Sequence, residues 1–187
     1  MTFDAAIPSA DVLVQQCLKG HPSAYRVLYD RYSKAMFNTA LRIVNKTADA
    51  EDVLQESFTD AFLQLSSFES KSTFGAWLKQ IVVYKSIAFL KRQRMNFVDM
   101  EMVGDIIEEA GIDEAEIWYT VDTIRQTIKQ LPDGYRTVLS LYLLEGYDHE
   151  EIAEILGIAQ STVRTQYIRA KQKLLQLLKK GEVYEQS

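Results

Sequence analysis

Residues that break helices or cross-link a chain are rare in this sequence. Only three prolines and eight glycines occur among 187 residues, and because no stretch is rich in either, long helices are permitted almost throughout. The single cysteine, Cys17, cannot form an internal disulfide, which fits a reducing compartment. Apolar runs stay well below the ~20 residues that span a bilayer, and the N-terminus lacks the pattern of a secretory signal. We therefore expect a cytoplasmic protein with no membrane insertion.

Reactive groups that could converge in a catalytic site are also few. The two histidines, His21 and His149, and the thiol of Cys17 lie far apart in the sequence. The chain has neither the spacing of metal ligands nor a phosphate-binding glycine loop. We expect no enzyme activity, no cofactor and no metal site.

Apolar residues recur at helical spacing over most of the chain, and strand-like alternation is not sustained anywhere. The predicted helix at 48–65, for example, places apolar side chains on one face and acidic and amide side chains on the other. The sequence predicts an all-α fold. Two small helical domains, residues 10–97 and 117–180, are joined by an acidic linker at 98–116.

The charges are segregated along the chain. The net charge of −5 argues at first against a nucleic-acid partner. However, residues 71–98 contain six basic residues and no acidic one, residues 99–122 contain nine acidic and no basic ones, and residues 160–181 contain six basic and no acidic ones. Because DNA binding depends on local cationic surface more than on total charge, the two basic segments favour DNA contacts over ordinary solvated helix faces.

Residues 148–178 have the pattern of a DNA-binding helix-turn-helix. Asp148 and Glu151 have the spacing of a capping box, which satisfies free amide donors at a helix start. Ala153 is small where a second helix would cross, and Gly157 stands where the chain must turn. An ordinary helical hairpin is the alternative interpretation of this pattern.

A second helix of this motif is expected from Ser161 to Leu178. Its predicted buried stripe consists of Val163, Tyr167, Ala170, Leu174 and Leu178. The basic residues lie mostly off this stripe. Such a helix can place its N-terminal half in a major groove, where arginines reach guanine edges or phosphates.

Four segments in a fixed order resemble one protein family. They are ADAEDVLQESF at 48–58, a basic helix at 74–92 that begins FGAWLKQIV, LPDGYR at 131–136, and the helix-turn-helix. Over roughly residues 11–180 the chain resembles the sigma-70 family of bacterial RNA polymerase sigma factors, in the small extracytoplasmic-function (ECF) class. The resemblance implies that the first segment docks on the polymerase clamp and that the second melts and reads the minus-ten element. The third would open the second domain, and the last would read the minus-thirty-five element.

This resemblance assigns roles to three groups of residues. Contact with core polymerase is expected from Asp52, Gln55 and Glu56. Contact with minus-ten DNA is expected from Lys71, Ser72, Tyr84, Lys85, Lys91 and Arg92. Contact with minus-thirty-five DNA is expected from Ser161, Thr162, Arg164, Thr165, Ile168, Arg169 and Lys171. The aromatic side chains of Phe74 and Trp77 are expected in the core instead.

Several positions depart from the family pattern. Tyr84 stands where an asparagine is usual, so that it either stacks on a base or packs inside, and Ala88 replaces an aspartate. Gln166 stands where arginine is common, which predicts one phosphate contact fewer. Ala159 replaces a capping serine and is a poor cap, so the second helix is expected to start later, at Ser161.

We therefore expect an ECF sigma factor that binds promoter DNA together with core RNA polymerase, through the clamp and flap regions of the enzyme. The resemblance also implies an anti-sigma partner. Two alternatives remain: a conventional dimeric helix-turn-helix regulator that binds a palindromic operator by itself, and a pure interaction module such as an adaptor. The acidic linker either occupies a cationic channel of polymerase or acts as a solvated spacer.

Overall fold

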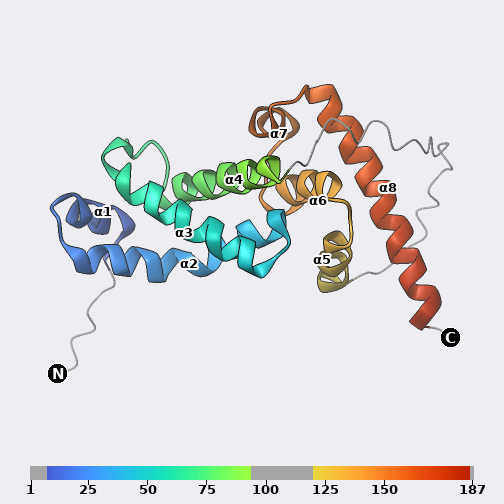
Figure 1. Cartoon of the computed structure of the whole chain (residues 1–187), viewed down its shortest axis with the longest axis horizontal. Coiled ribbons are helices and arrows are strands. Elements are labelled where there is room, and N and C mark those ends of the chain that lie inside the picture. Colours follow the sequence, from blue (N-terminus) through green and yellow to red (C-terminus); the bar gives the residue numbers. More distant parts are fainter. Residues whose placement is uncertain (1–7, 94–119, 186–187) are drawn as a thin grey trace. The chain divides into compact units, whose positions relative to one another are not determined.

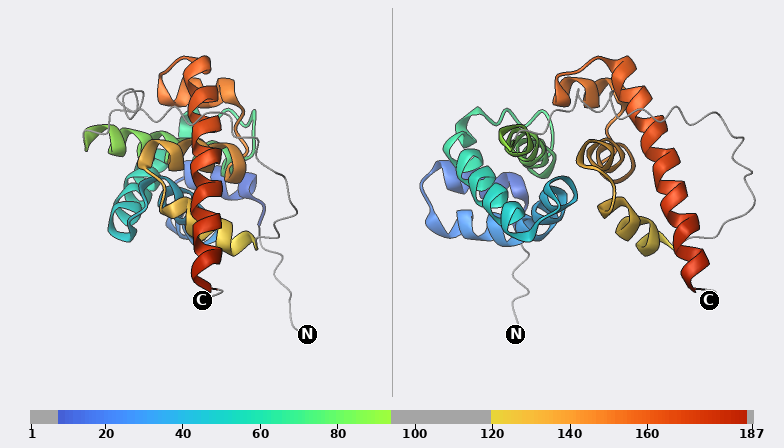
Figure 2. Two further views of the ribbon diagram at one scale, coloured as in Figure 1. Left: turned by 90° about the vertical axis from the view of Figure 1, so that its right-hand side faces the viewer. Right: turned by 45° about the vertical axis from the view of Figure 1, so that its right-hand side comes forward.

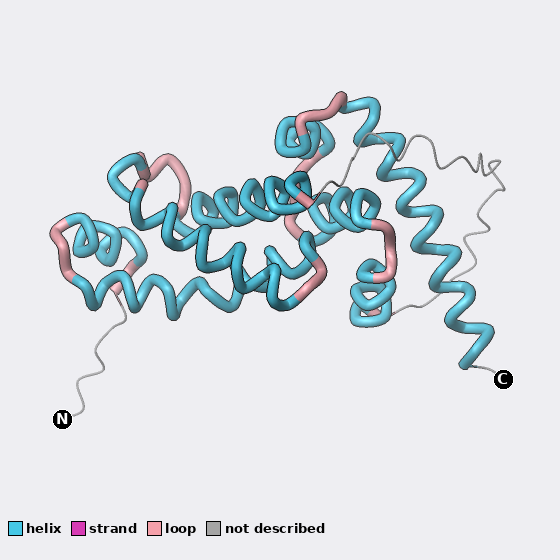
Figure 3. The backbone as a smooth tube through the Cα atoms, in the orientation of Figure 1, coloured by secondary structure: helices cyan, strands magenta, loops and turns pink. Residues whose placement is uncertain are grey.

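The computed structural model describes residues 8–93 and 120–185, and the regular elements in these two ranges are helical (Figure 3). The predicted all-α class is therefore confirmed. The chain divides into two compact units, Met1–Phe89 and Leu90–Ser187, each of which is described by itself. The acidic linker predicted at 98–116, and the predicted domain limits at 97 and 117, lie outside the described residues.

The first unit begins with three helices in succession. They are α1 (Ala10–Leu18), α2 (Pro22–Val44) and α3 (Thr47–Leu63). Ser9 caps α1 by accepting a hydrogen bond from the Val12 amide at 3.3 Å. Pro22 suits the first position of α2, where no amide hydrogen is needed. Asn45 ends α2 in the left-handed conformation, with φ of 62°, which asparagine tolerates.

A short 3-10 turn, η1 (Leu65–Ser67), and a loop lead to α4 (Phe74–Arg92), the last helix of this unit, whose final three residues lie past the unit limit at Phe89 (Figure 1). The helix α2 packs along α3, as the views in Figures 1 and 2 agree. Gly75 brings α4 close to α2, because a Cβ atom there would lie 2.8 Å from Cε1 of Tyr32. Phe74 is fully buried, as expected, whereas Trp77 is only half-buried.

The core of the first unit confirms the apolar faces that helical spacing predicts. Side chains from every helix of the unit are buried there, among them Leu13, Leu28, Ile43, Val53, Phe58, Leu78 and Val82. This burial supplies most of the stabilising free energy of such helices. It also turns the opposite, polar faces of α3 and α4 outward.

The second unit contains the helices that follow residue 120. They are α5 (Val121–Lys129), α6 (Asp133–Leu139), the π-helical turn η3 (Ser140–Leu144), α7 (His149–Leu156) and the long α8 (Gln160–Glu185). The helix α8 runs along its whole unit in Figures 1 and 2. One hydrophobic cluster joins α8 to α5 and α6, with Ile128, Leu131, Leu139, Ala170, Leu174 and Leu178.

The helix α8 begins earlier than expected. It starts at Gln160, so the predicted start at Ser161 is wrong. The Val163 amide donates to the carbonyl oxygen of Ala159 at 3.1 Å, which places Ala159 itself at the cap. The backbone hydrogen bond and the full burial of Val163 set this start, and neither requires a side-chain cap.

Candidate protein- and nucleic-acid-binding surfaces

The structure brings Asp52, Gln55 and Glu56 together on one face of α3. All three side chains are exposed, while Val53 and Leu54 between them are buried. Their spacing of three and four residues puts them on one side of the helix. The result is a polar, mainly acidic surface on a helix whose opposite side is packed in the core.

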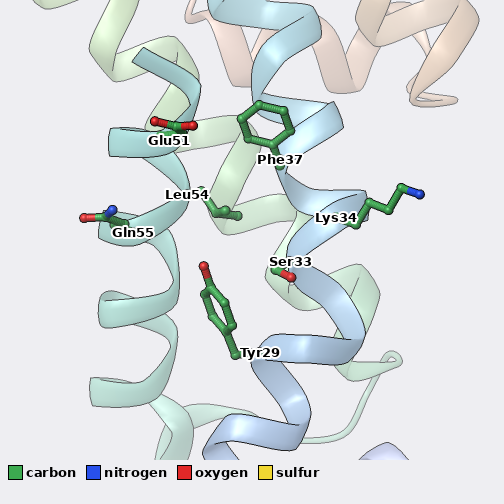
Figure 4. A pocket seen from close by; sticks show the side chains of 7 residues that line it. All are labelled: Tyr29, Ser33, Lys34, Phe37, Glu51, Leu54 and Gln55. Carbon is green, nitrogen blue, oxygen red and sulfur yellow. The ribbon is translucent and has the colours of Figure 1, made fainter. Parts of the chain in front are cut away.

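An open groove lies beside this face, between α2 and α3. It is lined by Tyr29, Ser33, Lys34 and Phe37 from α2 and by Glu51, Leu54 and Gln55 from α3. Figure 4 shows Tyr29, Phe37 and Leu54 between the two helices, with Lys34 and Gln55 pointing outward on opposite sides. Tyr29 is 38% exposed, so the groove offers accessible apolar surface next to the polar face.

The sequence did not indicate this groove. Tyr29 and Phe37 follow the helical spacing of core residues, and spacing alone does not tell a covered side chain from one at the edge of a packed pair. The exposed aromatic ring of Tyr29 beside Gln55 becomes visible only once α2 and α3 are packed together.

Lys85 on α4 points toward acidic residues of α3. Its Nζ atom lies 2.6 Å from Oδ2 of Asp60 and 3.7 Å from Oε2 of Glu56. The Lys85 side chain is 29% exposed, compared with 47% for Glu56. A residue expected to contact DNA and one expected to contact polymerase thus contact each other.

The other candidates for minus-ten contact lie on the surface. Tyr84 is 43% exposed, so of the two interpretations for this residue the packed one is wrong. Lys91 and Arg92 are exposed at the end of α4, and Ser72 is exposed in the loop before it. Lys71, in the same loop, pairs with Glu69 at 2.5 Å and is 84% exposed.

An aromatic cluster supports this loop. The ring centroid of Phe68 lies 5.9 Å from that of Phe74 and 5.2 Å from that of Trp77. Because Phe74 is fully buried, the cluster anchors the loop to the core of the first unit. Lys71 and Ser72 are therefore exposed on a loop that is packed against the core.

The first helix of the helix-turn-helix has the predicted capping box. Asp148 Oδ1 accepts hydrogen bonds from the amides of Glu150 and Glu151 at 2.8 and 2.9 Å, and the Asp148 amide donates to Glu151 Oε2 at 2.8 Å. Gly157 ends α7 with φ of 69°, a conformation that favours glycine. Ala153 is buried, as its small size predicts.

The helix α8 has one buried side and one exposed basic side. The predicted stripe is confirmed: Val163, Ala170, Leu174 and Leu178 are buried and Tyr167 is half-buried. The exposed residues include Ser161, Arg164, Thr165, Ile168, Arg169 and Lys171, with Thr162 intermediate. Ile168 is 56% exposed among these polar neighbours, so its aliphatic side chain is accessible to a partner.

Gln166 belongs to the inner side of α8. It is 4% exposed, three residues after Val163 and four before Ala170, and therefore shares their face. The expectation that its lack of charge removes a phosphate contact is wrong, because this position does not reach the exposed basic side.

Aromatic rings join α7 and α8 to η3. The ring of His149 stacks on Tyr142 with centroids 4.8 Å apart, and Tyr167 lies within 5.2 Å of both. Burial, together with the neighbouring Tyr142, raises the pKa of the Tyr167 phenol. Tyr167 is therefore neutral at physiological pH and packs the back of α8.

Two further observations concern the whole described part of the chain. Within residues 8–93 and 120–185, no group of three or more potential metal ligands comes together. No helix in those ranges is both long and apolar enough to cross a membrane.

One of the two helical units carries a helix-turn-helix with an exposed basic helix, which is the pattern of a DNA-binding protein. The comparisons with known proteins assign it to the transcription machinery. Residues 28–95 match the family model for Sigma-70 region 2, and residues 122–174 match that for Sigma-70, region 4. The chain is 33% identical over 172 residues to the ECF RNA polymerase sigma-E factor of Salmonella typhimurium, which covers 86% of this chain and 90% of that protein. It is 28% identical over 180 residues to the ECF RNA polymerase sigma factor SigW of Bacillus subtilis, with 89% and 95% covered. The chain belongs to the ECF family of RNA polymerase sigma factors.

Solved structures agree on the fold. The sigma factor RpoE from Bartonella quintana, in complex with the anti-sigma factor NepR, matches with a TM-score of 0.54 at 24% identity, over 83% of this chain and 96% of that one. CnrH, in complex with the cytosolic domain of CnrY, matches with a TM-score of 0.53 at 25% identity, over 91% and 97%.

Proposed function

We propose that this ECF sigma factor binds core RNA polymerase and directs initiation at specific promoters, with one DNA-binding surface in each unit. The observation that carries the proposal is the exposed basic side of α8, presented by a helix-turn-helix with its capping box and glycine turn. Family membership supplies the polymerase partner. Because a sigma factor acts where the polymerase is, a cytoplasmic location is part of this proposal.

The polymerase contact is assigned to Asp52, Gln55 and Glu56, together with the groove that Tyr29 and Leu54 line. Binding surfaces gain most of their affinity from a desolvated apolar centre surrounded by polar groups. The groove supplies the apolar part, and the acidic face suits a basic surface on the clamp of polymerase. A contact between the second unit and the flap region is also proposed.

The polymerase surface is tested by replacing Gln55→Ala together with Glu56→Ala. We expect loss of core binding in a pull-down with purified core enzyme, with an unchanged circular dichroism spectrum. The matched control is Gln15→Ala with Gln16→Ala, two exposed positions on α1. Unchanged core affinity of the Gln55/Glu56 variant would contradict the assignment.

Minus-ten contact is assigned to Lys71, Ser72 and Tyr84 with the basic residues Lys85, Lys91 and Arg92. Single-stranded DNA is bound by cations along its phosphates and by aromatic rings on which bases stack. The exposure of Tyr84 supports a stacking role in place of the usual asparagine.

Minus-thirty-five contact is assigned to the exposed side of α8. Its members are Ser161, Thr162, Arg164, Thr165, Ile168, Arg169 and Lys171. Arginine reads guanine edges or phosphates in a major groove, and an exposed aliphatic side chain such as Ile168 can contact a thymine methyl group.

The test of function is run-off transcription with purified core enzyme on a panel of promoters, with and without this protein. Specific initiation that depends on the protein supports a sigma factor. Tight binding of a palindromic operator without polymerase would instead support a dimeric regulator. An adaptor would be indicated if alanine at Arg164 and Arg169 left DNA binding and transcription unchanged.

An anti-sigma partner is part of the proposal. RpoE from Bartonella quintana was solved in complex with the anti-sigma factor NepR, and the family resemblance implies such a partner here. A protein that covers the α2–α3 groove would compete directly with polymerase. The same pull-down can measure whether a co-purifying partner and core polymerase compete for the surface that contains Gln55.

A further inference from the structure

The pairing of Lys85 with α3 links two surfaces to which different partners are assigned. Lys85 lies on α4, next to the exposed Tyr84, and its ammonium group is shared by Asp60 and Glu56. Glu56 lies on the same exposed face as Asp52 and Gln55. The helices α3 and α4 lie side by side in Figures 1 and 2, as the ion pairs require.

We propose that Lys85 is a positioning residue that masks Glu56 in the free protein and turns toward DNA when polymerase engages Glu56. This inference rests on the proposed function, because it takes the Glu56 face as the polymerase surface. It changes the role of Lys85 from a simple DNA contact to an internal counter-ion that polymerase displaces.

The energetics favour an exchange of this kind. A cation on polymerase that pairs with Glu56 meets a carboxylate already partly neutralised by Lys85, and the two cations repel each other. Because Lys85 and Glu56 are partly exposed, their pair contributes modestly and can be broken by a partner. A fully buried pair would resist such an exchange, because breaking it leaves an uncompensated charge away from water.

The chemistry of lysine suits both states. Its ammonium group is a compact charge on a flexible four-carbon stem, so the head can move while the stem stays packed against the helix. In the free protein Asp60, at 2.6 Å, holds the charge most closely. Once Glu56 pairs with polymerase, Lys85 loses one of its two carboxylate partners. A DNA phosphate near Tyr84 then competes with Asp60 alone for the Lys85 ammonium group.

Thermodynamic linkage makes this exchange reciprocal. If binding of polymerase to Glu56 raises the affinity of α4 for DNA, then DNA bound to Lys85 raises the affinity for polymerase by the same factor. The free protein therefore contacts single-stranded DNA weakly, and the strengthened contact appears on the polymerase-bound protein.

The decisive measurement is the affinity of the full chain for core polymerase when Lys85 loses its charge. We expect Lys85→Gln to bind core about two- to fivefold more tightly, because Glu56 is then unmasked. Lys85→Arg, which keeps the charge, is expected to bind as the unmodified chain does, and Lys19→Gln, at the exposed residue that follows α1, is the matched control. If Lys85 served only to hold α3 against α4, its loss would instead weaken core binding.

Folding and the proposed function are checked within the same series. Thermal unfolding followed by circular dichroism verifies each variant, and Lys85→Met replaces Lys85→Gln if the latter unfolds. The Gln55→Ala, Glu56→Ala variant is measured in parallel. If it loses affinity while Lys85→Gln is unchanged or weaker, the inference is overturned and the polymerase surface stands. If it retains affinity, the surface is wrong and the inference fails with it.

DNA binding supplies the second readout. The probe is a fluorescent single-stranded (dT)20, with and without core enzyme, over a range of salt concentrations. For the polymerase-bound protein, Lys85→Gln is expected to reduce the magnitude of the slope of log affinity against log salt by about 0.7, which corresponds to the loss of one phosphate contact. For the free protein the slope should not change. Equal slope changes in both states would overturn the inference, because Lys85 would then contact DNA independently of polymerase.

Discussion

Two arginine–aspartate pairs in the second unit have the same spacing but different surroundings. Asp122 and Asp133 each lie in the first turn of a helix, and each pairs with an arginine three residues later. Arg125 is half exposed, whereas the side chain of Arg136 is only 3% exposed. Arg136 also donates to the Leu131 carbonyl oxygen at 3.2 Å. Burial therefore makes the second pair much more important for stability.

We expect Asp133→Ala to lower the free energy of unfolding by about 1–3 kcal/mol, because a charged hydrogen-bonding group at Arg136 loses a partner. Asp122→Ala also removes an aspartate from the first turn of a helix, but from an exposed pair, and should have little effect. Urea unfolding followed by circular dichroism compares the two variants. Equal losses would contradict the role assigned to burial.

At the scale of elements, the start of α8 lacks a side-chain cap. Ala159 occupies the cap position, and its side chain has no oxygen that could accept from the free amides of the first turn. The preceding helix, α7, has a complete capping box at Asp148. The two helices of the motif thus begin with unequal local stabilisation, and α8 depends more on the packing of Val163.

Ala159→Ser is expected to stabilise the second unit by about 0.5–2 kcal/mol, since serine caps helices better than alanine by this amount. Thermal unfolding is the measurement. Ala159→Val, which adds bulk without a useful acceptor, is the control and should give no gain. A serine variant no more stable than the valine variant would show that the first turn of α8 is already satisfied.

The elements also show what a sequence can and cannot specify. Helical spacing and capping rules act within a few residues, so the box at Asp148, the turn at Gly157 and the stripe on α8 were predictable. The same periodicity places Gln166 on the buried face with Val163 and Ala170. The expectation of a phosphate contact at this position came from the family pattern instead. The pairing of Lys85 with Asp60 and the groove beside Tyr29 join separate helices, and local rules contain no information about such contacts.

The whole molecule combines a net negative charge with a helix, α8, whose exposed side is basic. The net charge is −5, yet residues 160–181 contain six basic residues and no acidic one. Long-range attraction to DNA is therefore limited, whereas local contact at α8 is favourable. If α4 supplies the second DNA surface proposed above, the two units bind one promoter best when polymerase holds both, because the second contact then becomes intramolecular.

Removing Arg164 and Arg169 together tests the contribution of α8 to the whole assembly. We expect the double alanine variant to keep its affinity for core polymerase but to lose specific initiation on promoters that require a minus-thirty-five element. If both arginines contact phosphates, the slope of log affinity against log salt for duplex promoter DNA falls by about 1.8. Run-off transcription and salt titrations of the polymerase-bound protein measure these effects.

The matched control is Lys179→Ala with Lys180→Ala, which removes two exposed charges from the other end of the same helix. Both double variants change the net charge equally, so a general electrostatic effect would lower the slope in both. A loss confined to Arg164 and Arg169 places the contact in the N-terminal half of α8, where the turn at Gly157 presents the helix. Equal losses would mean that the charge of α8 attracts DNA without reading it.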